Sequence, residues 1–155
     1  MAQIKLDIDN VDRRILTILR DDGRISWVQL SERVNLSPSA CQRRVEAMQA
    51  SGLIKRFSVD LDGDRLGLTV QAFISVKVER QNIGTAEGFR DKVTHYPEVM
   101  GFYKLSGNID YLIHLRVRDI PALSEFIDRR LLALDGVVDA SSSIVLEDLP
   151  ARFEL

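Results

Sequence analysis

Two helix starts separated by a tight turn, within residues 26–52, constrain the fold of this chain more than any other feature. Ser26 and Gln29 match a capping box, in which each side chain bonds a free amide at the start of a helix. Ser37 followed by Pro38 marks the second start, because serine caps free amides and proline loses no hydrogen bond at the first helical position. The sequence therefore predicts a short helix, a turn and a second helix that ends at the final glycine of this range.

A preceding helix is predicted after Asp9 and Asn10, both of which suit a helix cap, because apolar residues recur at helical spacing from Val11 until residues 21–23 stop the pattern. In the last of the three helices, Cys41, Val45 and Met48 lie at i, i+4 and i+7, so their side chains face the core. Small, polar and cationic side chains occupy the opposite face and its flanks, at about 100° per residue. The residues concerned are Ser39, Gln42, Arg43, Arg44, Glu46 and Ala47.

A short helix, a tight turn and a second helix of this kind form a helix-turn-helix, in which arginine and glutamine of the second helix read base edges in the major groove. We expect Lys55 and Arg56, in a strand after that helix, to meet the phosphate backbone. The pattern alone leaves a second interpretation open, in which Arg43 and Arg44 only form a solvated helix face. The predicted DNA contacts are Ser37, Ser39, Gln42, Arg43, Arg44, Lys55 and Arg56.

The two halves of the chain differ in charge. Residues 1–60 hold ten Lys or Arg against eight Asp or Glu, which gives a net charge of +2. Residues 61–155 hold eleven against fifteen, which gives a net charge of −4. Because the first half is the more basic, it is the half suited to face the phosphates of double-stranded DNA.

The composition, with 45% hydrophobic and 28% charged residues, is typical of a globular protein. No apolar run approaches the ~18 to 20 residues of a membrane span, and no signal-peptide pattern opens the sequence, so we expect a cytoplasmic, nucleoid-associated protein without membrane contact. The single cysteine, Cys41, is expected in the core. His95 and His114 are isolated, so the sequence predicts no metal site.

The second half of the chain alternates strand and helix patterns in the order of a split β-α-β domain. Such a ferredoxin-like domain has a four-stranded antiparallel sheet with two helices on one face. Phe73 and Tyr103 would be exposed on the other face, so we expect two subunits to pack sheet to sheet. The predicted elements are a strand over 72–78, a helix capped by Thr85 and ended near 96–97, a strand over 99–105, a turn at 106–108, a strand over 111–117, a helix from Asp119 to Gly136 and a strand over 137–146.

Short runs along almost the whole chain resemble the leucine-responsive (Lrp/AsnC) family of transcription regulators. Each run is weak alone, but their shared order is specific. The runs lie at residues 12–16, 23–26, 36–39, 43–45, 52–54, 66–67, 107–111, 134–137 and 142–145. The resemblance implies an α+β protein with a winged helix-turn-helix domain over residues 1–61, a hinge over 62–68 and a ferredoxin-like effector-binding and oligomerisation domain over 69–155.

The resemblance also implies an effector, usually an amino acid, bound between dimers that associate further into octamers. Gly107 would let a ligand approach the backbone, loop amides would hold its carboxylate, and Asp110 would accept hydrogen bonds from its ammonium group. Asn108 departs from the family, in which this position is often acidic, and leaves the charge preference of the ligand open. Taken alone, the loop is also compatible with an ordinary hairpin turn. The effector residues implied are Leu105, Gly107, Asn108, Asp110, Tyr111 and Ser142.

Two other functions compete with a regulator. Tetrapyrrole decarboxylases resemble the same two-domain layout, but they need a porphyrin pocket, and neither His95 nor His114 lies in a recognisable motif. A bare metabolite-binding or oligomerising module would leave DNA unbound. Because the outward face of the second helix is suited to DNA, we expect a regulator with no catalytic residues and no cofactor.

Overall fold

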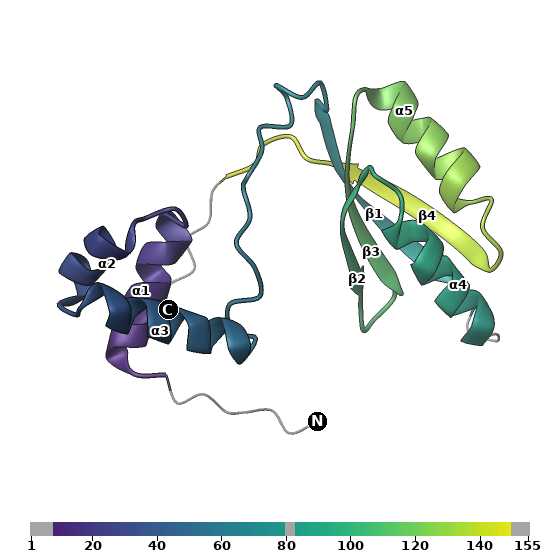
Figure 1. Cartoon of the computed structure of the whole chain (residues 1–155). Helices are drawn as coiled ribbons and strands as arrows, with labels where there is room; N and C mark the ends of the chain where they lie inside the picture. Colours follow the sequence, from purple (N-terminus) through teal and green to yellow (C-terminus); the bar gives the residue numbers. More distant parts are fainter. Residues whose placement is uncertain (1–7, 80–82, 150–155) are drawn as a thin grey trace. The chain divides into compact units, whose positions relative to one another are not determined.

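The computed structural model describes residues 8–79 and 83–149, with the backbone alone for residues 83–87. The described residues divide into two compact units, 8–60 and 61–149 (Figure 1). Across these ranges, each helix is too short or too polar to cross a lipid bilayer. We describe each unit by itself.

Local capping residues define the helices of the first unit. Asp9 caps the first helix, and Ser26 with Gln29 forms the predicted capping box at the second. Asn35 then takes a left-handed conformation with φ of 57°, which reverses the chain before Ser37 caps the third helix. These predictions are confirmed. The helices are α1 (Asn10–Asp21), α2 (Trp27–Val34) and α3 (Pro38–Ala50).

A small apolar core joins the three helices. The predicted inward stripe of α3, consisting of Cys41, Val45 and Met48, is buried. Burial raises the pKa of the Cys41 thiol, which is typical of a core residue and not of a reactive thiolate. Ile15 from α1 and Leu30 from α2 complete the centre of this core.

The strand predicted after α3 is wrong. Within residues 8–79, the segment from Leu53 to Leu61 forms no strand, and Lys55 and Arg56 lie in exposed backbone without ladder bonds. A strand needs a partner strand for its amides and carbonyls, and the described part of this chain supplies none here.

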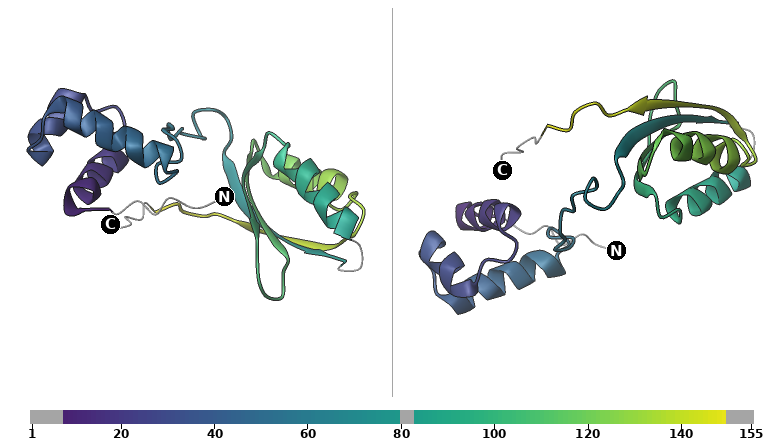
Figure 2. Two further views of the ribbon diagram at one scale, coloured as in Figure 1. Left: turned by 60° about the horizontal axis from the view of Figure 1, so that its bottom comes forward. Right: turned by 90° about the horizontal axis from the view of Figure 1, so that it is seen from above.

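The second unit has one antiparallel sheet in the order β2-β3-β1-β4, among the described residues. Its helices cover the same face of the sheet (Figure 2). This is the predicted ferredoxin-like arrangement. The elements are β1 (Val70–Val78), α4 (Ile83–Thr94), β2 (Val99–Lys104), β3 (Tyr111–Val117), α5 (Ile120–Glu125), η1 (Phe126–Leu131) and β4 (Val137–Ile144).

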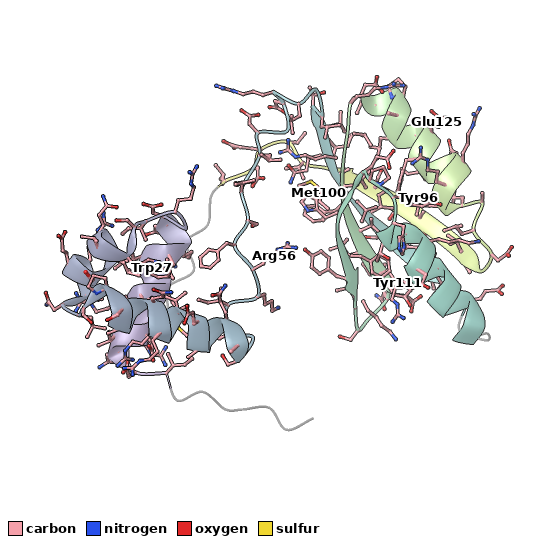
Figure 3. The ribbon with its side chains drawn as sticks, viewed as in Figure 1. Trp27, Arg56, Tyr96, Met100, Tyr111 and Glu125 are labelled. Atoms are coloured by element: carbon pink, nitrogen blue, oxygen red, sulfur yellow. The ribbon has the colours of Figure 1, made fainter. Side chains whose placement is uncertain are left out.

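Alternation along the strands separates a buried face from an open face. In β1, Ala72, Ile74 and Val76 point toward the helices and are fully buried. Tyr111 of β3 lies on the same helix side of the sheet (Figure 3). On the open face Tyr103 is exposed, as predicted. Phe73 is less exposed than predicted and is half-buried, because its ring stacks on the His114 ring of β3.

Two helix predictions in this unit are wrong. Helix α4 begins at Ile83, so Thr85 lies in its first turn and is not its cap. The expected continuous helix after Asp119 changes from α5 into the π-helix η1. Phe126 and Leu131 are five residues apart, about 140° in an α-helix. The wider π turn aligns them, and both are buried.

Candidate DNA-binding surface and effector-binding loop

Arg43 is the unengaged cation of the outward face of α3. Its side chain is exposed and makes no hydrogen bond or ion pair with any other described residue. Gln42 beside it donates from Nε2 to Glu46 Oε1 at 2.9 Å. Ser37 accepts the amide of Ala40 at 3.2 Å as the helix cap, so its hydroxyl already serves the fold. Arg43 is therefore the side chain best placed to meet an external partner.

Arg44 has a role that the sequence did not predict. Its Nη1 donates to Asp9 Oδ2 at 2.8 Å and to Asp12 Oδ1 at 2.9 Å, which ties α3 to the first turn of α1. The amide of Asp12 and then the Arg44 guanidinium lower the pKa of the Asp9 carboxyl below its ordinary value of 3.8. Two acids three residues apart at a helix start were the available signal for this contact.

The remaining predicted DNA residues lie near α3 in the sequence. Ser39, in the first turn of α3, is exposed and lies 3.2 Å from the hydroxyl of Ser37. Lys55 and Arg56 lie in the exposed segment after α3, where Figure 3 labels Arg56. Trp27 at the start of α2 is 38% exposed.

The loop between β2 and β3, residues 105–110, carries most of the implied effector residues and is closed by backbone hydrogen bonds. Leu105 donates its amide to the Asp110 carbonyl at 2.9 Å, and Asp110 donates its own amide to the Val76 carbonyl at 3.0 Å. The Asp110 carboxylate accepts the Val78 amide at 3.0 Å, so it braces the loop against β1. The tip residue Gly107 has φ of 140°, which strains any other residue, and faces open space. The exposed Asn108 follows it.

Two implied effector residues do not join this loop surface. Tyr111 is buried, with its ring 5.0 Å from that of Phe102, so its side chain belongs to the core. Ser142 lies on β4 opposite Ile74 of β1, and β1 separates β4 from β3. At ~4.8 Å per strand, Ser142 is about 10 Å across the sheet from β3. One chain therefore does not bring the whole implied set together.

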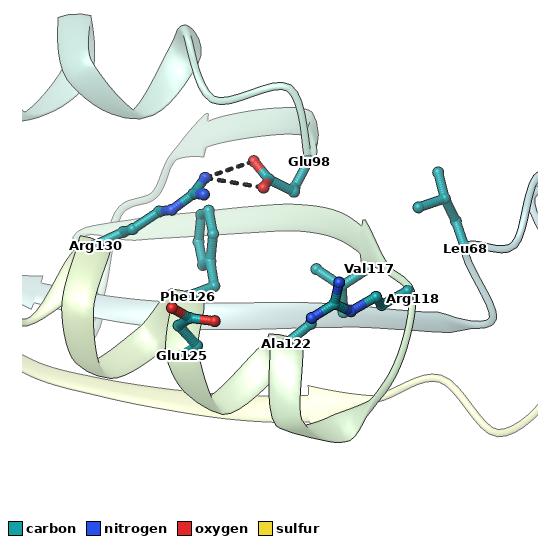
Figure 4. A pocket seen from close by; sticks show the side chains of 8 residues that line it. All are labelled: Leu68, Glu98, Val117, Arg118, Ala122, Glu125, Phe126 and Arg130. Carbon is teal, nitrogen blue, oxygen red and sulfur yellow. Dashed lines mark hydrogen bonds and ion pairs between the residues drawn. The ribbon is translucent and has the colours of Figure 1, made fainter.

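A separate pocket of about 290 Å³ opens beside α5 and η1 (Figure 4). Arg130 and Glu98 both line this pocket, and Arg130 donates to both carboxylate oxygens of Glu98 at 2.9 Å. The Arg130 guanidinium lies 5.5 Å from the centre of the Tyr96 ring. Phe126 forms part of the lining. None of residues 105–111 lines this pocket, so it is distinct from the predicted effector loop.

Comparison with known families settles the identity at the level of the family. The family described as "Lrp/AsnC ligand binding domain" matches residues 71–154, more than half of the chain. This chain belongs to the Lrp/AsnC family. A second family, described as "Winged helix-turn-helix DNA-binding", matches residues 8–55. The Lrp/AsnC resemblance expected from the sequence and both predicted domain types are confirmed.

Relatives of this Lrp/AsnC chain are named transcription regulators. It is 37% identical to the HTH-type transcriptional regulator AldR of Mycolicibacterium smegmatis over 92% of this chain and 84% of that protein. It is 35% identical to the leucine-responsive regulatory protein of Escherichia coli, over 92% and 87%. A Neisseria meningitidis transcriptional regulator, solved as a complex with L-Met, superposes with a TM-score of 0.89 at 37% identity, covering 95% of each chain.

These likenesses separate the competing functions. The matched families comprise a DNA-binding and a ligand-binding domain, and the relatives are regulators. The chain is therefore a DNA-binding transcription regulator with a ligand-binding domain and is not an enzyme of the tetrapyrrole type. Among the described residues, no group of three or more His, Cys, Asp or Glu side chains could hold a metal ion.

Proposed function

We propose that this Lrp/AsnC regulator reads DNA with the outward face of α3 and that Arg43 is its principal contact. The observation that carries the proposal is the division of labour between neighbours on α3: Arg44 is held by two carboxylates, whereas Arg43 meets none among the described residues. Ser39 and Gln42 would flank Arg43 on the groove, and the exposed Lys55 and Arg56 would meet phosphates.

The test of DNA reading is Arg43→Ala, measured by fluorescence anisotropy on a duplex that the wild-type protein selects from a random pool. A lost base or phosphate contact should cost ~1 to 3 kcal/mol, about a five- to 150-fold loss of affinity. Arg129→Ala is the matched control, because Arg129 is an exposed arginine of the second unit. This unit, residues 61–149, carries the ligand-binding domain and is called the sensor unit below. Unchanged affinity for Arg43→Ala, with folding intact, contradicts the assignment of Arg43.

For the effector we propose an amino acid, held at the loop 105–110 between two dimers. A relative solved with L-Met supports the ligand class, and the open space at Gly107 supports a close approach to the loop amides. A carboxylate has about four lone-pair positions, so Asp110 can accept an ammonium group while it holds Val78. Because Ser142 lies strands away in the same chain, a second chain would bring its copy to the loop.

Asp110→Asn tests the effector site with the loop brace retained, because an amide oxygen still accepts the Val78 amide. Loss of a charge-assisted bond contributing ~1.5 to 3 kcal/mol should weaken amino-acid binding roughly ten- to a hundredfold. Calorimetry against the common amino acids gives the dissociation constants, with the exposed Asp135→Asn as control. Wild-type affinity in Asp110→Asn would place the ligand elsewhere.

We further propose that two subunits pair through the open face of the sheet, as the minimal DNA-binding unit, and that such dimers assemble into octamers on the nucleoid. Exposed apolar side chains on β2, Met100 and Tyr103, support a covered face. Light scattering should give at least twice the 17.5 kDa chain mass. A monomer at micromolar concentration would overturn this assembly.

A further inference from the structure

Three polar side chains form a connected row on the open face of the sheet. Gln71 of β1 lies opposite Arg116 of β3, and its neighbour on that face, Phe73, lies opposite His114. Arg116 Nη2 donates to Gln71 Oε1 at 2.6 Å, and Gln71 Nε2 lies 2.9 Å from His114 Nε2. The amide of Gln71 therefore joins the guanidinium to the imidazole.

The row has a fixed direction. A guanidinium can only donate, so the single amide oxygen of Gln71 must face Arg116 and its amide nitrogen must face His114. An amide nitrogen also only donates, so His114 Nε2 has to be the acceptor. This requires a neutral His114 ring with its proton on Nδ1.

Arg116 also holds the segment 62–68, which leads from the DNA-binding unit into β1. Its Nη1 donates to the Leu68 carbonyl at 3.4 Å and lies 3.7 Å from Asp64 Oδ1. Gly63 is buried, and a Cβ atom there would come within 2.7 Å of Arg116 Cζ. The turn is closed by the Leu68 amide, which donates to the Gly63 carbonyl at 2.8 Å. The Arg116 guanidinium therefore packs against this turn and binds it.

We propose that Gln71, His114 and Arg116 form a relay that latches segment 62–68 onto the sheet, and that a proton on His114 releases the latch. A protonated Nε2 would point a donor at the donor nitrogen of Gln71. Turning the amide over would satisfy His114 but would set the same nitrogen against the Arg116 guanidinium. An unturned amide loses its bond to His114, whereas a turned amide loses the bond that orients the Arg116 guanidinium, and this second outcome is the one that releases segment 62–68.

The groups around His114 favour its neutral form. Burial first, and then Arg116 on the same strand, lower the pKa of His114 below its ordinary value of 6.5, while Asp148 acts in the opposite direction. Phe73 of β1 stacks on the ring with centroids 4.6 Å apart. From β2, the opposite residue is Gly101, over which the Tyr103 ring lies. The latch is therefore closed at neutral pH.

The sign of the pH effect follows from this shift. Because the folded state binds the His114 proton less readily than the unfolded chain, the latch stabilises fully above pH 6.5 and weakens as pH falls from 6.5 toward the folded value. Release would lengthen the tether between the units. In the proposed dimer, it would lower the effective concentration of one DNA-binding unit near the other. This last consequence rests on the proposed function, whereas the latch itself does not.

The experiment follows amide exchange in residues 61–69 of the full chain without DNA, corrected for intrinsic rates, at a protein concentration where assembly is equal at both pH values. In the wild type, exchange should rise about tenfold between about pH 7.5 and pH 5. His114→Gln keeps an acceptor without a titrating group and should abolish the rise, whereas His95→Gln, at the only other histidine, should keep it. Arg116→Ala should exchange fast at both values.

A rise in His114→Gln equal to that of the wild type would overturn the proposal. A ring-nitrogen NMR spectrum of the wild type is a second test, and it needs no variant to fold. At about pH 7.5 the proton should lie on Nδ1 of His114. A proton on Nε2 at that pH would equally overturn the relay.

Discussion

The two units differ in how far apart in the sequence their decisive contacts lie. In the DNA-binding unit, each helix start is fixed by bonds within three residues, such as those between Ser26 and Gln29. In the sensor unit, the polar row joins Gln71 to Arg116 across 45 residues. Local contacts make the start of α3 predictable from its own sequence, whereas the polar row exists only after distant strands have paired.

The largest expected effect comes from a cavity-forming substitution in the core of the sensor unit. Ile113 is fully buried on β3, so Ile113→Ala should cost ~2 to 5 kcal/mol in the free energy of unfolding of this unit. Ile144→Ala, at a 43% exposed position on β4, should cost much less. Denaturant unfolding measures both, and amide exchange at Leu30 should stay unchanged. Faster exchange there would mean that the two units unfold together.

Arg44→Ala tests the long-range contact of the DNA-binding unit, which departs from its local pattern. The change leaves the Asp12 side chain, only 8% exposed, without its cation, so we expect a loss of ~1 to 3 kcal/mol in the free energy of unfolding. Arg43→Ala should leave stability unchanged and weaken DNA binding instead. Equal losses of stability in the two variants would contradict the division of labour on α3.

The same contact predicts a pH effect at acid pH. Because the Asp12 amide and Arg44 lower the folded pKa of Asp9 below 3.8, its stabilising contribution is full above pH 3.8 and is lost as pH falls toward the folded value. Asp9→Asn should remove this part of the pH dependence. Acid titrations of wild type and variant, followed by circular dichroism, compare the two, and parallel curves would refute the assignment.

The smallest expected effect belongs to a single cap. Ser26→Ala removes the side-chain acceptor of the Gln29 amide and should cost ~1 kcal/mol in the free energy of unfolding of the first unit. Ser58→Ala, in the exposed segment after α3, should cost nothing measurable. Thermal unfolding measures both. A cost above that of Arg44→Ala would show that α2 depends on its cap more than α3 depends on its distant carboxylates.

The sequence by itself determined the elements whose signals are local. The caps at Asp9, Ser26 and Ser37 set the helix starts, and the spacing of apolar residues set their buried faces. The strands of the sensor unit followed from alternation, and their order from the split β-α-β pattern. These elements are predictable from the sequence alone, because a cap or an alternation of apolar residues depends only on residues nearby in the chain.

Tertiary structure decided the remaining features, because each depends on a partner far away in the sequence. The Arg44 side chain, which the helical pattern placed on a flank of the outward face, lies against the start of α1 because Asp9 is beside it after folding. Lys55 lies in no strand, because the described chain supplies no partner strand there. The π-helix η1 forms where Phe126 and Leu131, five residues apart, are both buried in the core. The Asp110 carboxylate braces the loop because folding brings the Val78 amide to it from β1. Periodicity reports which face of an element is apolar; only the packed chain decides which polar group meets which.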